Sequence, residues 1–310
     1  MNYKHAEYVM TIVEQGGITA AARVLHISQP SLSQTVKAVE SDLGAPLFSR
    51  AGNRLTLTPA GRRYVDGVRE IMTLEKNLRG EIAEMASDHR ATLRIGISAS
   101  RSVSLLPRIL PEFMKRWPLV GVELKESPSV HLEELLEKGG CDIAFITTSF
   151  KQNELEYLLV ENEQIVLMAA AGTELARRVP SGTEIELDEA RDENFVTLTS
   201  GHSVRAIQDH LCSRLALSPR VLIEVPGMDA AKLIAAESGA VMICPYGFIQ
   251  GDPRVEGRVS CYPLRCHGFE RHFYFCYPRR LRLTAAMRDL YELARGCCRG
   301  HTMEAPHGNE

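Results

Sequence analysis

Between Ser28 and Glu40 the chain carries side chains that could read DNA bases. At 100° per residue, apolar residues form one stripe of the expected helix, and short polar residues lie on the opposite face. Ser28 is a suitable N-cap, Pro30 fits the first turn, and Gly44 suits the C-terminal end. Small polar side chains at a helix start can enter the major groove and bond to base edges. An ordinary solvated amphipathic helix is the alternative, and this segment alone does not decide between them.

The elements around this helix favour the first interpretation. An alanine-rich helix is expected over 18–25, a turn follows at His26 and Ile27, and a supporting helix is expected over 4–14. Two helices joined by a tight turn, the second with a polar face, form a helix-turn-helix. After Gly44 the segment 52–57 predicts a small β-wing.

Over about sixty residues, many residues at fixed spacings match the pattern of a known protein family. The matching runs are Gly17–Ala21, Leu25–Ser33, Val39–Glu40, Leu43–Arg50 and Leu57–Gly61. They are similar to the winged helix-turn-helix of LysR-type transcriptional regulators. The resemblance implies an operator of double-stranded DNA as partner, with RNA polymerase as a further partner if the protein is an activator. The predicted DNA-binding residues are Gln29, Pro30, Ser31, Ser33, Gln34, Lys37, Arg50 and Arg54.

Two positions depart from the family pattern. Gly17 stands where the family usually has serine, at a helix N-cap where glycine is only slightly worse. Gln34 stands where many members have a basic residue, which exchanges a phosphate-seeking charge for an amide that can pair with adenine. We therefore expect Gln34 to affect base preference, and Lys37 and Arg54 to contribute affinity for any DNA sequence.

The segment 59–88 predicts one long helix that begins after the Thr58 cap. A heptad seam runs along it, with one interruption at Glu75 that Leu74 can partly replace. A lone helix cannot bury such a seam, so we expect a homodimer, as in LysR-like proteins; docking onto the body of the same chain is the alternative. The seam positions are Tyr64, Val68, Ile71, Glu75, Leu78, Ile82 and Met85.

Composition and charge agree with a DNA-binding module on a separate body. The 310 residues are 45% hydrophobic and 24% charged, which is typical of globular proteins. Residues 1–63 carry a net charge of +3, and because the whole chain has −3, the remainder carries −6. Neither a signal peptide nor a run long enough to span a membrane is evident, so we expect a cytoplasmic protein with no membrane partner.

From residue 92 onward, apolar runs alternate with helices, which predicts α/β layering. This order resembles the LysR effector-binding domain, whose two lobes are like those of type 2 periplasmic solute-binding proteins. The resemblance implies lobe I over 92–161 and 266–300, and lobe II over 162–265, with chain crossings near Asn162 and Pro263. The full prediction is a winged helix-turn-helix over 1–58 (motif about 18–37), a linker helix over 59–88, an effector-binding domain over 92–302 and a flexible tail over 303–310.

Hydroxyl groups follow several of the predicted strands and point to a ligand site. The two lobes should present strand ends and helix N-termini to the cleft between them, and Arg101 adds a guanidinium suited to a carboxylate. Each serine or threonine could be only an N-cap; together, and given the family's cleft, they favour a small organic anion as co-inducer, without any other cofactor. The predicted effector-binding residues are Ser98, Ser100, Arg101, Ser127, Thr147, Thr148, Thr199, Ser200, His202, Ser203 and Pro245.

Two other classes of protein share parts of this pattern. Gly201-His202-Ser203-Val204-Arg205 resembles the nucleophile elbow of an α/β hydrolase with Ser203 as nucleophile, but Arg205 replaces the final glycine and no oxyanion segment precedes it. A transport-type solute-binding protein would suit the body but not residues 1–88. We therefore predict no catalytic residue.

The eight cysteines are expected to be reduced thiols. Cys141 and Cys244 lie in apolar runs, and the spacing around Cys266 is not that of a structural zinc site, so no metal is predicted. The adjacent Cys297 and Cys298 favour a loosely packed tail over a metal or redox site. A LysR-type thiol sensor remains the alternative within the family, although Cys212 has no basic neighbour closer than Arg214.

Overall fold

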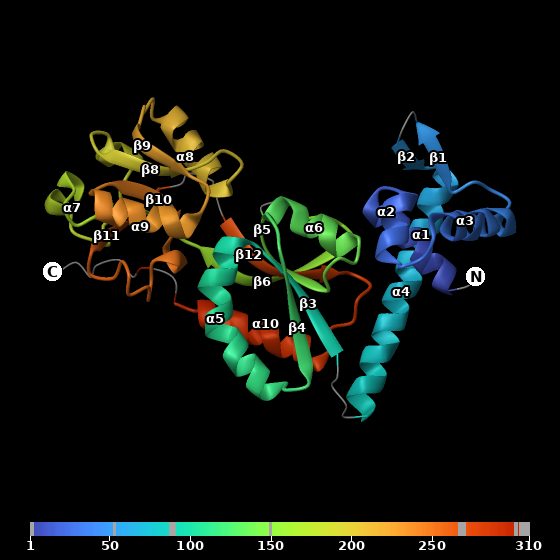
Figure 1. The fold of residues 1–310 in the computed structure, drawn as a ribbon. Coiled ribbons are helices and arrows are strands. Elements are labelled where there is room, and N and C mark those ends of the chain that lie inside the picture. Colours follow the sequence, from blue (N-terminus) through green and yellow to red (C-terminus); the bar gives the residue numbers. More distant parts are fainter. Residues whose placement is uncertain are drawn as a thin grey trace. The chain divides into compact units, whose positions relative to one another are not determined.

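The computed structural model of the protein describes residues 3–51, 54–86, 91–148, 151–265, 271–300 and 303. The chain divides into two compact units, an N-terminal one that reaches Ile82 and a second that holds most of the remaining residues. The elements of each unit are labelled in Figure 1.

The N-terminal unit contains a helix-turn-helix. Its helices are α1 (Tyr3–Gln15), α2 (Ile18–Val24) and α3 (Gln29–Leu43). A buried cluster that includes Ile12, Ala21 and Leu32 holds the three helices together, and the small alanine lets α2 approach closely. The turn between α2 and α3 places His26 at φ 53°, a conformation that few non-glycine residues adopt.

Both ends of α3 have the caps that the sequence predicts. The Ser28 hydroxyl accepts a hydrogen bond from the Ser31 N–H at 3.3 Å. At the other end Gly44 has φ 68°, and Ala45 N–H donates to the Glu40 carbonyl at 3.1 Å. The Glu40 carboxylate then accepts the N–H of Leu47 at 2.7 Å, which fixes the chain leading to the wing.

The wing and the long helix complete this unit. Strands β1 (Phe48–Ala51) and β2 (Arg54–Leu57) pair antiparallel, and α4 (Pro59–Ala86) follows. Thr58 caps α4 by accepting the Gly61 N–H at 2.9 Å. A Cβ at Gly61 would lie 2.0 Å from the Leu47 carbonyl oxygen, so only glycine allows α4 to pack this closely on the wing segment.

Lobe I of the second unit is a five-stranded sheet in the order β4-β3-β5-β12-β6. Helix α6 packs on one face of the sheet, while α5 and α10 pack together on the other (Figure 1). Buried aromatic residues Phe273 and Phe275 lie on β12, and Phe145 on β5 stacks on the first and contacts the second edge to face. The strands are β3 (Ala91–Ile97), β4 (Val120–Glu126), β5 (Ile143–Thr148), β6 (Leu155–Glu163) and β12 (Arg271–Pro278), and the helices are α5 (Ala99–Arg116), α6 (Ser129–Glu137) and α10 (Ala285–Cys298).

Lobe II has the same plan, with its strands in the order β11-β7-β10-β8-β9 and α8 and α9 on opposite faces (Figure 1). Strand β7 is buried at every residue, as expected for a strand covered on both faces. The strands are β7 (Ile165–Ala170), β8 (Asn194–Leu198), β9 (Arg220–Val225), β10 (Val241–Pro245) and β11 (Val259–Pro263). The helices are α7 (Glu174–Arg178), η1 (Leu187–Ala190), α8 (Ser203–Arg214), α9 (Met228–Ser238) and η2 (Tyr246–Phe248).

The chain passes between the lobes more often than the sequence indicates. Strand β6 ends at Glu163 and β7 begins at Ile165, so the first crossing is a single residue, Gln164. Strand β11 ends at Pro263, near the second expected crossing. Beyond α10, Met303 packs against the lobe II core, and its N–H donates to the Gln164 side chain at 2.7 Å.

Candidate DNA interface and interlobe site

The outward face of α3 is polar and accessible. Gln29, Pro30, Ser31, Gln34 and Lys37 are exposed, whereas Leu32, Val36 and Val39 on the opposite stripe are buried. The Gln29 amide donates to the Ser33 hydroxyl at 2.9 Å, which orders these two side chains along one turn. The predicted DNA-binding residues of the helix therefore share one solvent-facing surface, with amide and hydroxyl groups available to base edges.

The remaining predicted DNA contacts belong to the wing. Arg50 lies on β1 opposite Leu55, and Arg54 lies on β2 opposite Ala51. Both arginines are thus on the two paired strands, and their side chains lie outside the part of the chain that the structure describes.

The predicted seam on α4 divides into two parts. Val68 is 2% exposed and Tyr64 packs beside it, so the first two seam positions belong to the core of their own winged helix-turn-helix. From the third position onward the stripe is open, because Ile71, Leu78 and Ile82 are 40%, 56% and 55% exposed. The seam available to a partner is therefore shorter than the sequence indicates.

A buried ion cluster lies where the two lobes meet. Its centre is Glu163, whose side chain is 1% exposed and whose carboxylate is bonded to two guanidinium groups. Arg101, in the first turn of α5, donates to Oε1, and Arg271 Nε donates to Oε2 at 2.8 Å. Glu163 and Arg271 are directly opposite each other on β6 and β12, so strand register sets this pair. Arg271 also donates to the hydroxyl of Ser203, the first residue of α8 in lobe II.

Two aromatic rings enclose the Arg101 guanidinium. Its carbon atom lies 4.0 Å from the ring centre of Phe273 and 4.5 Å from that of Phe248. Phe273 belongs to the lobe I sheet and Phe248 to lobe II, so the charge is held between lobes. Burial lowers the pKa of Arg101 to about 10, and burial likewise lowers the pKa of Arg271 to about 10. Both arginines thus remain charged at neutral pH.

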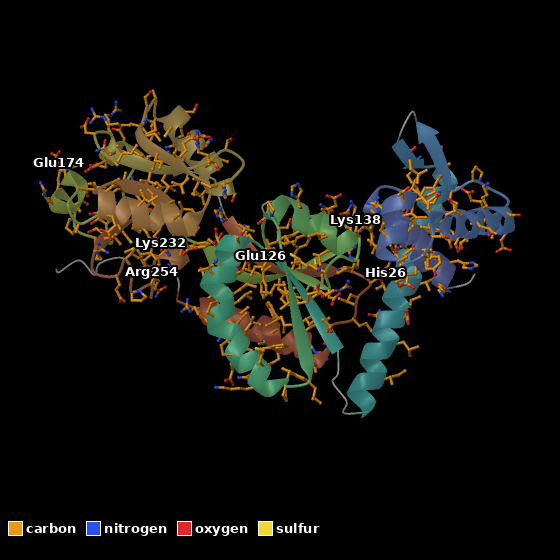
Figure 2. The ribbon with its side chains drawn as sticks, in the orientation of Figure 1. His26, Glu126, Lys138, Glu174, Lys232 and Arg254 are labelled. Atoms are coloured by element: carbon orange, nitrogen blue, oxygen red, sulfur yellow. The ribbon has the colours of Figure 1, made fainter. Side chains whose placement is uncertain are left out.

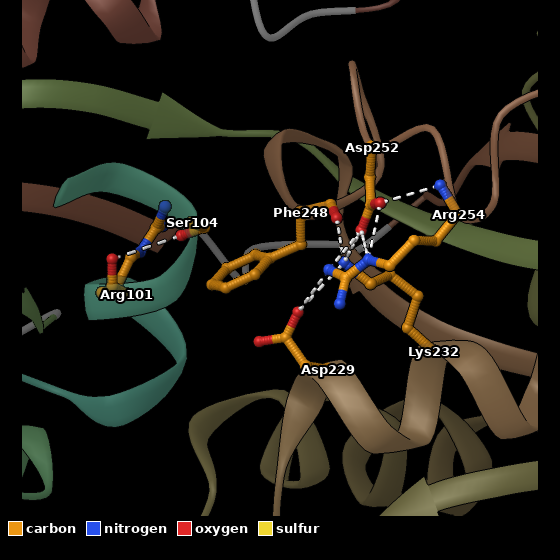
Figure 3. Close-up of polar contacts among 7 residues, drawn as sticks. All are labelled: Arg101, Ser104, Asp229, Lys232, Phe248, Asp252 and Arg254. Atoms are coloured by element: carbon orange, nitrogen blue, oxygen red, sulfur yellow. Dashed lines mark hydrogen bonds and ion pairs between the residues drawn. The ribbon is translucent and has the colours of Figure 1, made fainter. Parts of the chain in front are cut away.

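A second ion cluster holds Phe248 in place from within lobe II (Figure 3). Lys232 on α9 is buried, and its Nζ donates to the Phe248 carbonyl at 2.8 Å and to Asp252 at 2.6 Å. Arg254 donates to both carboxylate oxygens of Asp252, which holds the pKa of that carboxyl well below its usual range. Lys232 and Arg254 lie in the same part of lobe II (Figure 2), and Phe248 extends from there toward α5 (Figure 3).

The other predicted effector-binding residues lie at the carboxyl ends of strands in both lobes. In lobe I they are Ser98 and Ser100 at the start of α5, Ser127 after β4, and Thr147 and Thr148 at the end of β5. In lobe II they are Thr199, Ser200, His202 and Ser203 between β8 and α8, and Pro245 at the end of β10. Of the full set, Arg101 and Ser203 are joined into one cluster by Glu163 and Arg271, which the sequence did not single out.

Arg101 differs from the expectation in one respect. The sequence offers it as a guanidinium ready for a bound anion, whereas the structure pairs it with an internal carboxylate and leaves the residue 5% exposed. The reason is the position of Glu163 at the end of β6, which no local pattern places beside α5. In the sequence, only the charge of Glu163 and its position next to the expected crossing at Asn162 indicate a residue of the interlobe site.

The geometry around Ser203 does not suit a nucleophile. Its hydroxyl accepts a hydrogen bond from the Arg271 guanidinium, which is a donor and cannot remove a proton from serine. Among the described residues, moreover, no group of three or more His, Cys, Asp and Glu side chains is arranged to hold a metal ion. None of the helices in the described ranges combines the length and apolar character needed to cross a membrane.

The described cysteines are poor candidates for a thiol switch. Cys141, Cys212, Cys244, Cys261, Cys276 and Cys298 are buried, and Cys297 is half-buried. Burial raises the pKa of Cys212, and it raises that of Cys261 to about 12. A hydrogen bond with Cys297 raises the pKa of Cys298. Because the thiolate is the reactive form, these environments suppress reaction with oxidants. Cys266 lies outside the described residues.

Two protein-family descriptions match this chain. Residues 3–62 match the bacterial regulatory helix-turn-helix protein, lysR family, and residues 86–299 match the LysR substrate binding domain. The two matches cover the winged helix-turn-helix and both lobes.

Similar proteins span most of the chain. YcgK of Bacillus subtilis (strain 168), an HTH-type transcriptional regulator, is 30% identical over 259 residues, which cover 79% of this chain and 80% of that protein. The transcriptional dual regulator GltC of the same organism is 25% identical over 296 residues, covering 94% of this chain and 96% of its own.

Solved structures share the fold over nearly the whole length. A single-substitution variant of full-length OxyR from Pseudomonas aeruginosa has a TM-score of 0.73 at 20% identity and covers 99% of both chains. Full-length CbnR in complex with its target DNA has a TM-score of 0.55 at 19% identity, covering 96% of this chain and 100% of that chain. At these identities the likeness concerns the fold alone.

Proposed function

This chain belongs to the LysR family of transcriptional regulators, and from that premise we propose that it binds an operator as a dimer and changes this binding when a small organic anion occupies the interlobe site. Its winged helix-turn-helix is the DNA-binding module, and its two-lobed domain binds the effector. The observation that carries the anion assignment is the Arg101–Glu163–Arg271 cluster, because two buried guanidiniums from separate elements converge on one carboxylate position.

The exposed face of α3 supports the assignment of DNA contacts. Its polar side chains are accessible over the first two turns, while Leu32, Val36 and Val39 on the apolar stripe are buried in the core. Gln34 has an amide of the kind that pairs bidentately with adenine, and Lys37 can reach phosphate from the next turn. In this proposal Gln34 contributes specificity, and Lys37, Arg50 and Arg54 contribute affinity.

Exposed apolar surfaces support assembly with further copies of the chain. On α4 the open stripe begins at Ile71, and Leu74 is 67% exposed. One edge strand of each sheet also has exposed apolar residues, with Leu124 on β4 and Leu222 on β9 exposed by 42% and 49%. Pairing through α4 would give a dimer with two half-sites on DNA, and pairing through the effector domains would give a tetramer.

The effector acts because it binds two arrangements of the lobes with different affinities. An anion that binds one arrangement of the lobes more tightly shifts the population toward it, and that shift changes the spacing of the DNA-binding modules. If the protein is an activator, the altered complex would present a different surface to RNA polymerase. A thiol-based response is the alternative, and the buried thiols with raised pKa values favour the anion instead.

Gel shifts on the DNA upstream of the protein's own gene test this proposal. Full-length protein is titrated with and without each of a panel of carboxylates, with chloride at equal ionic strength as the control. We expect specific binding and a change of affinity or band pattern with at least one carboxylate. Binding that is indifferent to every carboxylate but altered by peroxide would favour the thiol alternative.

A further inference from the structure

The interlobe cluster has an internal carboxylate where a ligand's carboxylate would be expected. Glu163 bridges Arg101 and Arg271 with its two oxygens, as a bound carboxylate would bridge two guanidiniums. The bridge is nearly closed to solvent, since the side chains of Arg101, Arg271 and Glu163 are 6%, 9% and 1% exposed. An external anion can take the position between these two arginines only if Glu163 moves.

The cluster also leaves hydrogen-bonding capacity unused. The Nε atom of Arg101 is buried and has no hydrogen-bond partner among the described residues. Buried donors are rarely left in this state without an ordered water, an ion or a functional reason. The Phe248 and Phe273 rings contact the guanidinium through their π faces and supply no hydrogen-bond acceptor to its Nε. Among the described residues no oxygen atom bonds to this edge of the guanidinium, although Glu161 also acts electrostatically on Arg101, so the edge can accept a ligand oxygen.

Glu163 is also tied to the connection between the lobes. It is the last residue of β6, and only Gln164 separates it from β7 in lobe II. Its partner Arg271 reaches lobe II through the Ser203 hydroxyl. A free carboxylate could neutralise Arg101 without this tether, whereas Glu163 neutralises it while holding the crossing segment against α5. The two occupants would therefore stabilise different arrangements of the crossing.

We propose that Glu163 occupies the position of the effector's carboxylate, and that the effector is a carboxylate that binds by replacing Glu163 on Arg101. This inference rests on the proposed function and adds the ligand class and the competing residue. A simple monocarboxylate cannot compete with a carboxylate that is part of the chain. The effector molecule must therefore have a second group besides its carboxylate. That group gains affinity by contacting the hydroxyl-bearing strand ends or the Phe248 and Phe273 rings.

Chemical rescue of Glu163→Ala tests the inference, because the substitution opens a space of about the size of acetate beside both arginines. Thermal unfolding of the full-length protein is followed in rising sodium acetate, and in sodium chloride at equal ionic strength. Wild type is one control. Glu184→Ala is the other, since Glu184 is paired with Arg265 at the surface of lobe II.

We expect Glu163→Ala to unfold at a lower temperature than wild type, and acetate but not chloride to raise that temperature saturably. For wild type, and likewise for Glu184→Ala, acetate and chloride should change the unfolding temperature by the same amount. The inference is overturned if acetate raises the unfolding temperature of Glu163→Ala no more than chloride does. It is also overturned if acetate raises the unfolding temperature of wild type as much as that of Glu163→Ala. If Glu163→Ala does not fold in chloride, its refolding yield in acetate decides: recovery supports the inference, and no recovery in either salt overturns it.

The outcome is separable from that of the proposed function. Operator binding by wild type that responds to a larger carboxylate, together with no acetate rescue of Glu163→Ala, would leave the anion-responsive regulator standing and remove Glu163 as the competitor. Rescue by acetate without any carboxylate effect on operator binding would show that the Glu163 position accepts a free carboxylate, but would remove the carboxylate effector and the proposed anion response.

Discussion

The α3 face and the interlobe cluster are both polar, but the polar groups of the first are exposed to solvent and those of the second are buried and paired. On α3, Gln34 and Lys37 face solvent, while the helix is held by its caps and its apolar stripe. Between the lobes, Arg101 and Arg271 are buried and paired with Glu163. The first surface can meet DNA as it stands, whereas the second must exchange one partner for another. Variants on α3 should therefore alter binding without altering stability, and variants in the cluster should alter both.

The largest effect is expected for Arg271→Ala. This change removes one partner of the buried Glu163 carboxylate and the bond to Ser203, so the free energy of unfolding should fall by about 3–5 kcal/mol. Urea denaturation of the full-length protein measures it. The matched control is Arg265→Ala, which breaks an exposed pair with Glu184 and should cost about 0–1 kcal/mol. Equal losses for the two variants would contradict a special role for the buried cluster.

The next effect concerns assembly through α4. Leu78→Glu places a charge in the open apolar stripe, and because the side chain is 56% exposed, the monomer should fold normally. We expect sedimentation to show a loss of dimer, at protein concentrations where Asp66→Asn, on the same helix, remains dimeric. A fully dimeric Leu78→Glu protein would mean that the stripe is not the interface.

A smaller effect is expected for Gln34→Ala. Loss of its amide should remove about 1–3 kcal/mol of discrimination at one base pair and leave other positions unchanged. Competition binding with single-base variants of the operator measures this preference. Gln15→Ala, which removes an exposed glutamine at the end of α1, should have no such effect. A uniform loss of affinity on every variant would contradict base reading by Gln34.

The smallest effect is expected for Lys37→Ala. Removing one phosphate-directed charge should weaken binding to all sequences similarly and reduce the magnitude of the slope of log K against log salt by about one. Fluorescence anisotropy over a range of salt concentrations gives the slope, with Lys138→Ala, an exposed lysine next to Glu134 in lobe I, as control. A change in base preference would assign Lys37 to base contacts instead.

The sequence predicts the N-terminal unit well because its determinants are local. The Ser28 cap, the Gly44 end and the apolar stripe lie within one helix, and the structure forms α3 over Gln29–Leu43. The alternation of strands and helices in the body is also visible locally. The apolar runs that indicate strands do not include β6, which charges interrupt, or β11, which contains a serine and a proline, and α7 has only five residues.

The interlobe cluster could not be predicted in the same way. Arg101 and Glu163 are 62 residues apart, and Glu163 and Arg271 are 108 apart, so their pairing depends on strand order and register. The sequence indicated an anion-binding guanidinium at Arg101 but not the internal carboxylate that neutralises it. The α4 seam shows the same limit: heptad spacing does not reveal that Val68 is already used by the core of its own domain.

Anisotropy titration of the upstream DNA most directly tests whether the effector's carboxylate acts through Arg101. Wild type and Arg101→Met are each titrated with and without the carboxylate that shifts wild-type binding. This variant should be less stable than wild type, but Glu163 keeps its bond to Arg271, so the variant should still fold and bind DNA at the temperature of the titration. We expect the carboxylate to change the wild-type Kd by about tenfold, equivalent to about 1.4 kcal/mol, and to leave the Kd of Arg101→Met unchanged. An Arg101→Met protein that keeps the full shift would show that the effector does not act through Arg101.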